Sequence, residues 1–154
     1  MHQRIQRFSR ILKLREDDRR SEQTLLAEER REEKDVLDRL FSLEGERARA
    51  VEDFCGCACG ENAASCSELW FRRQFIDSIQ DRIHEGRDSL QDVRQRIAGT
   101  EARLVERHKD VRVMETYVDS LRAADFRSRI EAEQLELDDL ATVRYSRARK
   151  GAEG

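Results

Sequence analysis

Apolar residues recur along the chain at alternating steps of three and four residues, in two long runs separated by a short segment rich in glycine and cysteine. In the first run, nine of the fifteen positions on these steps from Ile5 to Phe54 are apolar, and its middle is polar. Such spacing places the apolar side chains in one stripe along a helix, as in a coiled-coil seam. The apolar positions of this first seam are Ile5, Phe8, Leu12, Leu26, Val36, Leu40, Leu43, Ala50 and Phe54.

A second seam, with fewer polar interruptions, begins at Leu69 and keeps its phase to Leu121. After Leu121 the phase slips by about one residue, which predicts a local change of supercoil. The pattern then resumes with Phe126, Ile130, Leu137 and Leu140. The apolar positions of the second seam are Leu69, Ile76, Ile79, Ile83, Leu90, Val93, Ile97, Leu104, Val111, Met114, Val118 and Leu121.

The segment between the seams, residues 55–67, concentrates glycine and small residues and is expected to be a turn. Two narrow seams joined by a turn can cover each other by folding back antiparallel. The prediction is an all-α, antiparallel two-helix coiled-coil hairpin with unequal arms, in one domain of residues 1–154. Helix one is expected at about 4–54 and helix two at about 68–149, with facing residue numbers adding to about 122. This register places Leu40 near Ile83, Leu26 near Ile97 and Ile5 near Tyr117.

The second arm is the longer one, so its end lacks a partner helix. The unpaired part is expected to span residues 119–149, about 45 Å of helix. Because it still carries apolar residues on one face, we expect it to bind another protein.

Composition supports long helices and argues against a thick globular core. The chain has no proline, 41% charged residues and a net charge of -3. Because basic and acidic residues nearly balance, the net charge indicates neither nucleic acid nor an acidic lipid surface as a partner. Locally, residues 1–15 hold five basic residues and no acidic one. No run of about 20 apolar residues and no signal peptide is recognisable, so a cytoplasmic protein is expected.

The four cysteines fall within twelve residues, in the pattern C-x-C-x-C-x6-C. Three interpretations of Cys55, Cys57, Cys59 and Cys66 stay open: turn residues without a ligand, a four-thiolate metal site, or a redox-responsive group. The spacing is unusual for structural zinc, and no metal ligand is assigned. We identify no catalytic constellation and no cofactor motif, so the chain is expected not to be an enzyme.

Near the start of helix one stands Phe8-Ser-Arg-Ile-Leu-Lys-Leu-Arg-Glu, and near the start of helix two stands Trp70-Phe-Arg-Arg-Gln-Phe-Ile-Asp-Ser-Ile. These two segments and a run near the C-terminus resemble the FliJ family of the flagellar export apparatus. The C-terminal run is similar to the family pattern R-x-E-Q-x-x-x-D-E-x-A, although Asp139 replaces the usual Glu and Arg129 stands further from Glu133 than in the pattern. The matching positions are Arg129, Glu133, Gln134, Asp138, Asp139, Leu140 and Ala141.

The resemblance implies a cytoplasmic, stalk-like subunit of the flagellar type III export machine that binds no nucleotide. Its implied partners are the hexameric export ATPase, the export gate protein of the inner membrane and the export chaperones. Alternatives are a generic coiled-coil adaptor, a homologue in a virulence secretion system, and a hairpin governed by its four thiols.

Two sets of partner-binding residues are expected on this basis. The gate set is expected to be exposed near the turn, although Leu40 and Ile79 could instead pack in the seam. The ATPase set lies on the unpaired end, where a solvated acidic face is the alternative. The gate set is Leu40, Leu43, Arg47, Phe75 and Ile79, and the ATPase set is Glu133, Gln134, Asp138, Asp139 and Leu140.

Overall fold

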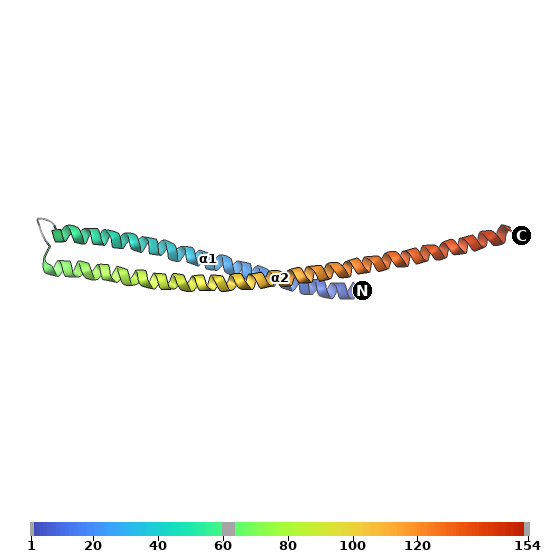
Figure 1. The fold of residues 1–154 in the computed structure, drawn as a ribbon, viewed down its shortest axis with the longest axis horizontal. Coiled ribbons are helices and arrows are strands. Elements are labelled where there is room, and N and C mark those ends of the chain that lie inside the picture. Colours follow the sequence, from blue (N-terminus) through green and yellow to red (C-terminus); the bar gives the residue numbers. More distant parts are fainter. Residues whose placement is uncertain (1, 60–63, 153–154) are drawn as a thin grey trace. The chain divides into compact units, whose positions relative to one another are not determined.

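The computed structural model describes residues 2–59 and 64–152, with side chains described up to residue 148. It contains two helices, α1 at His2–Cys59 and α2 at Cys66–Ala152, which Figure 1 colours from blue to red along the chain. No strand occurs in the described part of the chain. The all-α helical hairpin expected from the two seams is confirmed.

Both helices extend into the segment that was expected to be a turn. α1 continues past Phe54 to Cys59, and α2 begins at Cys66. The single glycine in this end of α1, Gly56, costs only about 1 kcal/mol relative to alanine, which is too little to end a long helix. The Ala64 N–H donates to the Cys57 carbonyl over 3.2 Å, which satisfies one of the carbonyls left free at the end of α1.

The chain divides into two compact units. The turn unit is Arg20–Val105, and the terminal unit is Met1–Arg19 together with Glu106–Gly154. Both units contain parts of α1 and of α2, because each helix is continuous across the boundary.

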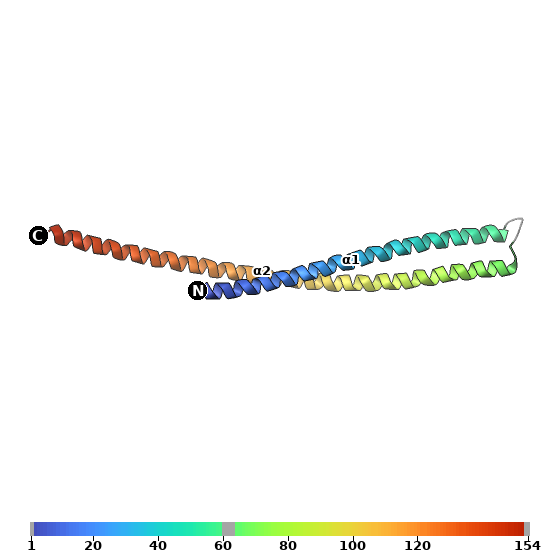
Figure 2. The same cartoon turned by 180° about the vertical axis from the view of Figure 1, so that it is seen from behind.

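In the turn unit the two helices run side by side in opposite directions, as the blue-green and green-yellow ribbons of Figures 1 and 2 show. Leu40 shares one buried cluster with Ile83, and Leu26 shares the other with Ile97, as the register predicted. The first cluster comprises Val36, Leu40, Leu43, Ile79 and Ile83, and the second comprises Leu26, Val93 and Ile97.

Ion pairs flank the seam of the turn unit from Glu22 to Glu44 of α1. They are largely exposed, so each contributes on the order of 0–1 kcal/mol and mainly orients one helix against the other. The pairs are Arg103–Glu22, Arg30–Glu101, Arg96–Glu32, Arg94–Glu33 and Arg87–Glu44. Two polar residues, Glu29 and Thr100, are buried in the seam itself.

In the terminal unit the first 18 described residues of α1 pack along α2. The Phe8 ring meets the Tyr117 ring edge to face with centroids 4.8 Å apart, and Arg4 donates to the Tyr117 hydroxyl over 2.8 Å. Tyr117 was expected near Ile5, whereas the recorded ring contact is with Phe8, about one helical turn further on. Val111, Val118 and Leu121 are buried on the α2 side.

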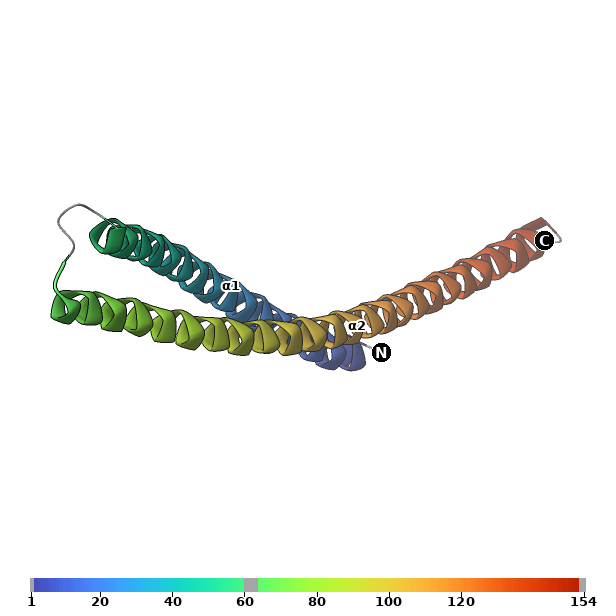
Figure 3. The same ribbon diagram turned by 60° about the vertical axis from the view of Figure 1, so that its left-hand side comes forward.

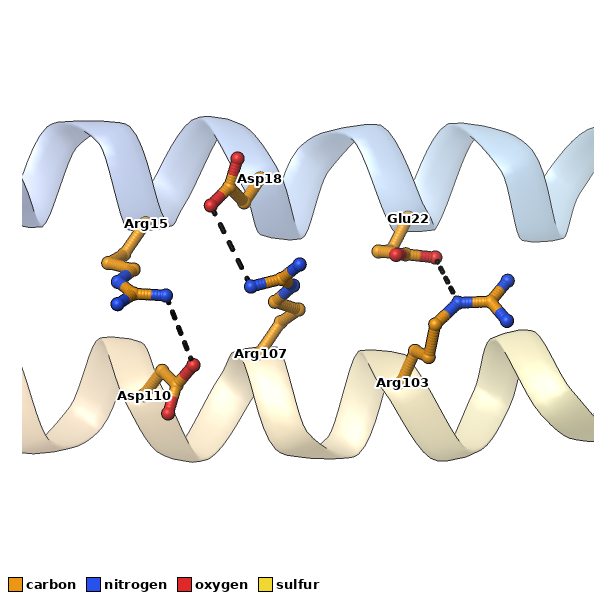
Figure 4. A network of polar contacts seen from close by, with 6 residues as sticks. All are labelled: Arg15, Asp18, Glu22, Arg103, Arg107 and Asp110. Atoms are coloured by element: carbon orange, nitrogen blue, oxygen red, sulfur yellow. Dashed lines mark hydrogen bonds and ion pairs between the residues drawn. The ribbon is translucent and has the colours of Figure 1, made fainter.

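The register explains that difference. The pairs Arg15–Asp110 and Arg107–Asp18 have residue numbers that add to 125, which is also the value for Cys59 and Cys66 at the helix ends. Figure 4 shows these two pairs of the terminal unit, and it also shows Arg103–Glu22 of the turn unit. The offset from the expected value follows from the longer α1, whose extra turn at Cys59 moves the facing positions.

Gly86 of α2 lies against Leu40 of α1 in the core of the turn unit. A Cβ atom built on Gly86 would stand 2.7 Å from Leu40 Cδ2, well inside van der Waals contact. A groove of about 230 Å³ opens beside this contact, bordered by Val36, Leu43 and Arg82. The missing side chain at Gly86 therefore lets the two helices approach closely.

We expect alanine at Gly86 and at Gly45 to have opposite effects. Each replacement should add about 0.5–1 kcal/mol of helix propensity. Gly45 has open space around it, so Gly45→Ala should raise the free energy of unfolding. At Gly86 the overpacking of Leu40 should cost about 1–3 kcal/mol, so Gly86→Ala should lower it. Urea unfolding followed by circular dichroism measures both changes, and equal stabilisation of the two variants would refute the close contact.

Candidate partner-binding surfaces

The start of α2 is capped by the side chain of Ser65. Ser65 Oγ accepts a hydrogen bond from the Glu68 N–H over 3.2 Å, and Glu68 in turn forms an ion pair with Arg72 over 3.2 Å. The hydrogen bond to Glu68, assisted by the nearby Cys57 sulfur, raises the pKa of Arg72 above its ordinary value. The first two turns of α2 are therefore well defined.

The first three turns of α2 present three exposed aromatic side chains. Trp70, Phe71 and Phe75 are each more than half exposed, and the Trp70 and Phe71 rings meet edge to face at 5.1 Å. We call these three residues the turn-end aromatic patch. Phe71 and Phe75 also border a groove of about 280 Å³, whose other walls are Ala50, Asp53 and Arg72. Large exposed aromatic groups are typical of protein-binding surfaces.

The structure corrects part of the gate set. Leu40, Leu43 and Ile79 were expected to be exposed, but they are 7%, 6% and 0% exposed and form the core of the turn unit. The expectation was wrong because these residues occupy seam positions, where α1 and α2 cover each other. Arg47 and Phe75 are exposed, as expected.

Sequence analysis missed Trp70 and Phe71 as candidates. They lie next to the seam position Leu69 but outside the stripe itself. Aromatic residues placed off a seam have no partner within a two-helix hairpin, and this signal could have identified them.

α2 extends well beyond the last residue that α1 covers. Leu121 is buried, whereas every side chain from residue 126 to residue 148 is exposed. In Figures 1, 2 and 3 this orange-to-red part of α2 has no second helix beside it. We call residues 126–148 the overhang. It begins a few residues later than the expected 119, because Leu121 is still buried.

The overhang carries an apolar stripe. Phe126, Ile130, Leu137 and Leu140 follow steps that keep them on one face of the helix, and all four are exposed. Three further exposed apolar residues were not among the expected binding residues: Leu135, Val143 and Tyr145.

The five residues of the ATPase set do not share one face. Glu133 lies seven residues before Leu140, so both belong to the apolar stripe. Gln134 and Asp138 are four residues apart and lie along one flank of the stripe. Asp139, about 100° further around the helix than Asp138, lies close to the side opposite the stripe. A partner that contacts all five must therefore surround much of the helix.

The cysteines do not form a metal centre among the described residues. Cys55, Cys59 and Cys66 are exposed, Cys57 is half-buried, and all four are free thiols. No three His, Cys, Asp or Glu side chains of residues 2–59 and 64–148 lie together as metal ligands would. Helical spacing explains part of this, because Cys57 lies on the opposite side of α1 from Cys55 and Cys59.

None of the described helices carries an apolar stretch long enough to cross a bilayer.

Comparison with known proteins identifies the family. The family model described as Flagellar FliJ protein matches residues 3–150, which covers both arms of the hairpin. No curated protein and no solved structure matches the chain. The resemblance seen in the three sequence segments is thereby confirmed.

We expect truncation of Ile79 and truncation of Phe75 to have very different effects on the free energy of unfolding. Ile79→Ala should lower the free energy of unfolding by about 2–5 kcal/mol, because it removes a fully buried side chain. Phe75→Ala should change it by less than about 0.5 kcal/mol, because the ring is mostly in water. Urea unfolding provides the measurement. A large loss of stability for Phe75→Ala would show that the ring packs within the hairpin.

Proposed function

The chain belongs to the FliJ family and is a component of the flagellar export apparatus, and on this premise we propose that it is a non-enzymatic, stalk-like link in that apparatus. It connects the hexameric export ATPase, the export gate protein and the export chaperones during flagellum assembly. Because these partners meet at the inner membrane, it acts in the cytoplasm and associates peripherally with the cytoplasmic face. The proposal assigns no catalytic role, cofactor or metal to any residue.

The overhang is the observation that carries this proposal. A helix with Phe126, Leu137 and Leu140 in water gains free energy when a partner covers the stripe, at about 25 cal/mol per Å² of apolar surface. The rest of α2 has already covered its stripe with α1. The overhang is therefore the part of α2 with the most to gain from a partner.

We assign the overhang to the export ATPase. A helix with its side chains is about 10–12 Å wide, which suits the axial opening of a six-membered ring. A ring also surrounds a helix, and this agrees with the placement of Glu133, Gln134, Asp138, Asp139 and Leu140 on several sides of the overhang. The acidic side chains would meet basic groups that line the opening.

We assign the turn-end aromatic patch, with Arg47, to the export gate. Phe75 and its neighbours supply rigid apolar contact area, and Arg47 supplies a charge. The buried residues Leu40, Leu43 and Ile79 act indirectly, because their packing holds α1 and the start of α2 in place.

The ATPase assignment predicts that two charges placed on the stripe weaken binding to the export ATPase. Leu137→Glu with Leu140→Glu should weaken binding to the purified cognate export ATPase by at least about tenfold, since it removes contact area from the centre of the interface. Leu37→Glu with Phe41→Glu is the matched control, because it adds the same two charges at exposed apolar residues of the turn unit, outside the overhang. Biolayer interferometry measures affinity, and circular dichroism verifies the helix. Unchanged affinity of the double variant would exclude the stripe as the ATPase contact.

The gate assignment predicts that binding to the export gate can be weakened without affecting binding to the ATPase. Phe75→Ala with Arg47→Glu should weaken binding to the cytoplasmic domain of the export gate protein by about tenfold while leaving ATPase binding intact. Arg31→Glu controls for the added charge, because Arg31 is exposed in the same unit. A variant that loses both partners together, or neither, would argue against two separate surfaces.

A further inference from the structure

Two segments of the terminal unit carry charge of one sign only. Residues 2–15 contain five basic residues and no acidic one, and residues 130–143 contain five acidic residues and no basic one. Both segments are helical. Each has fourteen residues and is therefore about 21 Å long. The basic residues are Arg4, Arg7, Arg10, Lys13 and Arg15, and the acidic residues are Glu131, Glu133, Glu136, Asp138 and Asp139.

Most of these charges have no partner among the described side chains. Arg15 pairs with Asp110, and Arg4 donates to the Tyr117 hydroxyl. Arg7, Arg10 and Lys13 contact no described carboxylate, and none of the five acidic side chains of the overhang contacts a described basic group. Both segments therefore offer unpaired charge of opposite sign to a partner.

The basic segment and the acidic segment cannot form ion pairs with each other within one chain. The basic segment lies along the part of α2 that ends near Leu121, as the Phe8–Tyr117 and Arg15–Asp110 contacts show. The acidic segment begins nine residues later on the same continuous helix, about 13 Å further along its axis. Its complement must come from another molecule.

The basic segment adjoins an open apolar groove on α2. This groove of about 450 Å³ is lined by Arg112, Val113, Thr116, Tyr117 and Ser120, and Val113 is 67% exposed.

Tyr117 links that groove to α1, because its hydroxyl accepts the hydrogen bond from Arg4 and its ring packs on Phe8. Arg7 lies three residues after Arg4, and the exposed Leu14 lies seven residues after Arg7, so both share that side of α1. Arg4, Arg7, Leu14, Val113 and Tyr117 together form what we call the receiving face.

We propose that two copies of this chain associate tail to tail, with the overhang of each copy lying on the receiving face of the other. The apolar stripe of the overhang covers Val113 and Leu14, and its flanking carboxylates lie beside Arg7 and Arg10. Overhangs that paired only with each other would bring five carboxylates against five, which is repulsive. The receiving face provides the opposite charge together with exposed apolar surface.

The arrangement closes on itself. Each copy has one overhang and one receiving face. A twofold axis therefore occupies both surfaces of both copies in a dimer and leaves no free site for a third copy. The association needs no export partner, and its test uses the purified chain alone, so its failure leaves the proposed function standing. In the dimer the stripe is covered, and the ATPase must displace the second copy to reach it.

Sedimentation velocity of the full chain, kept reduced because of its exposed cysteines, tests the dimer. The wild-type chain should show a monomer–dimer equilibrium that weakens in about 1 M salt, where charges are screened beyond about 3 Å. A basic-face variant, Arg7→Glu with Arg10→Glu and Lys13→Glu, should raise the dissociation constant at least about tenfold. An overhang variant, Glu133→Lys with Asp138→Lys and Asp139→Lys, should do the same.

The mixture of these two variants is the decisive measurement. In a heterodimer, both contacts again join opposite charges, so the mixture should dimerise although each variant alone does not. Arg31→Glu with Lys34→Glu and Arg49→Glu is the control, because it makes the same charge change on exposed residues of the turn unit and should leave the dimer intact.

Three results would overturn the proposal. The first is a wild-type chain that stays monomeric at every concentration in low salt. The second is two folded variants whose mixture does not recover the dimer. The third is a monomeric chain that binds anionic lipid vesicles through Arg7, Arg10 and Lys13, since the basic face would then serve a membrane surface.

Discussion

The apolar seam between α1 and α2 holds this molecule together, and it is narrow. With 41% charged residues, neither helix has enough apolar surface to form a core alone, so each must cover the stripe of the other. The two clusters around Leu40 and Leu26 carry this burial in the turn unit, and Val111, Val118 and Leu121 carry it in the terminal unit. The flanking ion pairs are largely exposed, so they affect the alignment of the two helices more than the free energy of unfolding.

A narrow seam also decides which surfaces remain for other proteins. Wherever both helices are present, the apolar residues of the stripe are buried between them. Those that stay in water are either off the stripe, as in the turn-end aromatic patch, or on the stripe beyond Leu121, where α1 has ended. The surfaces proposed to bind partners thus arise from unequal helix lengths and from aromatic residues placed outside the seam.

Much of the fold could be predicted because heptad spacing reports directly on which side chains share a face. Every apolar seam position from Ile5 to Phe54 and from Leu69 to Leu121 is buried or half-buried. The pairing of Leu40 with Ile83 and of Leu26 with Ile97 also followed from spacing. The helix ends did not follow from spacing. The end of α1 at Cys59 involves the Ala64–Cys57 hydrogen bond, and the start of α2 depends on the cap at Ser65.

The candidate sites were harder to predict than the fold. Arg47, Phe75 and the residues of the overhang are exposed as expected, whereas Leu40, Leu43 and Ile79 are core residues and Trp70 and Phe71 were overlooked. Periodicity and the absence of proline predicted the helices and the hairpin, and three segments pointed to the FliJ family, which the family model then confirmed. Exposure is a property of what lies opposite a residue, and that depends on register and on where each helix ends. Because contacts between distant segments settle both, the accessible surfaces emerged only once the two helices were packed together.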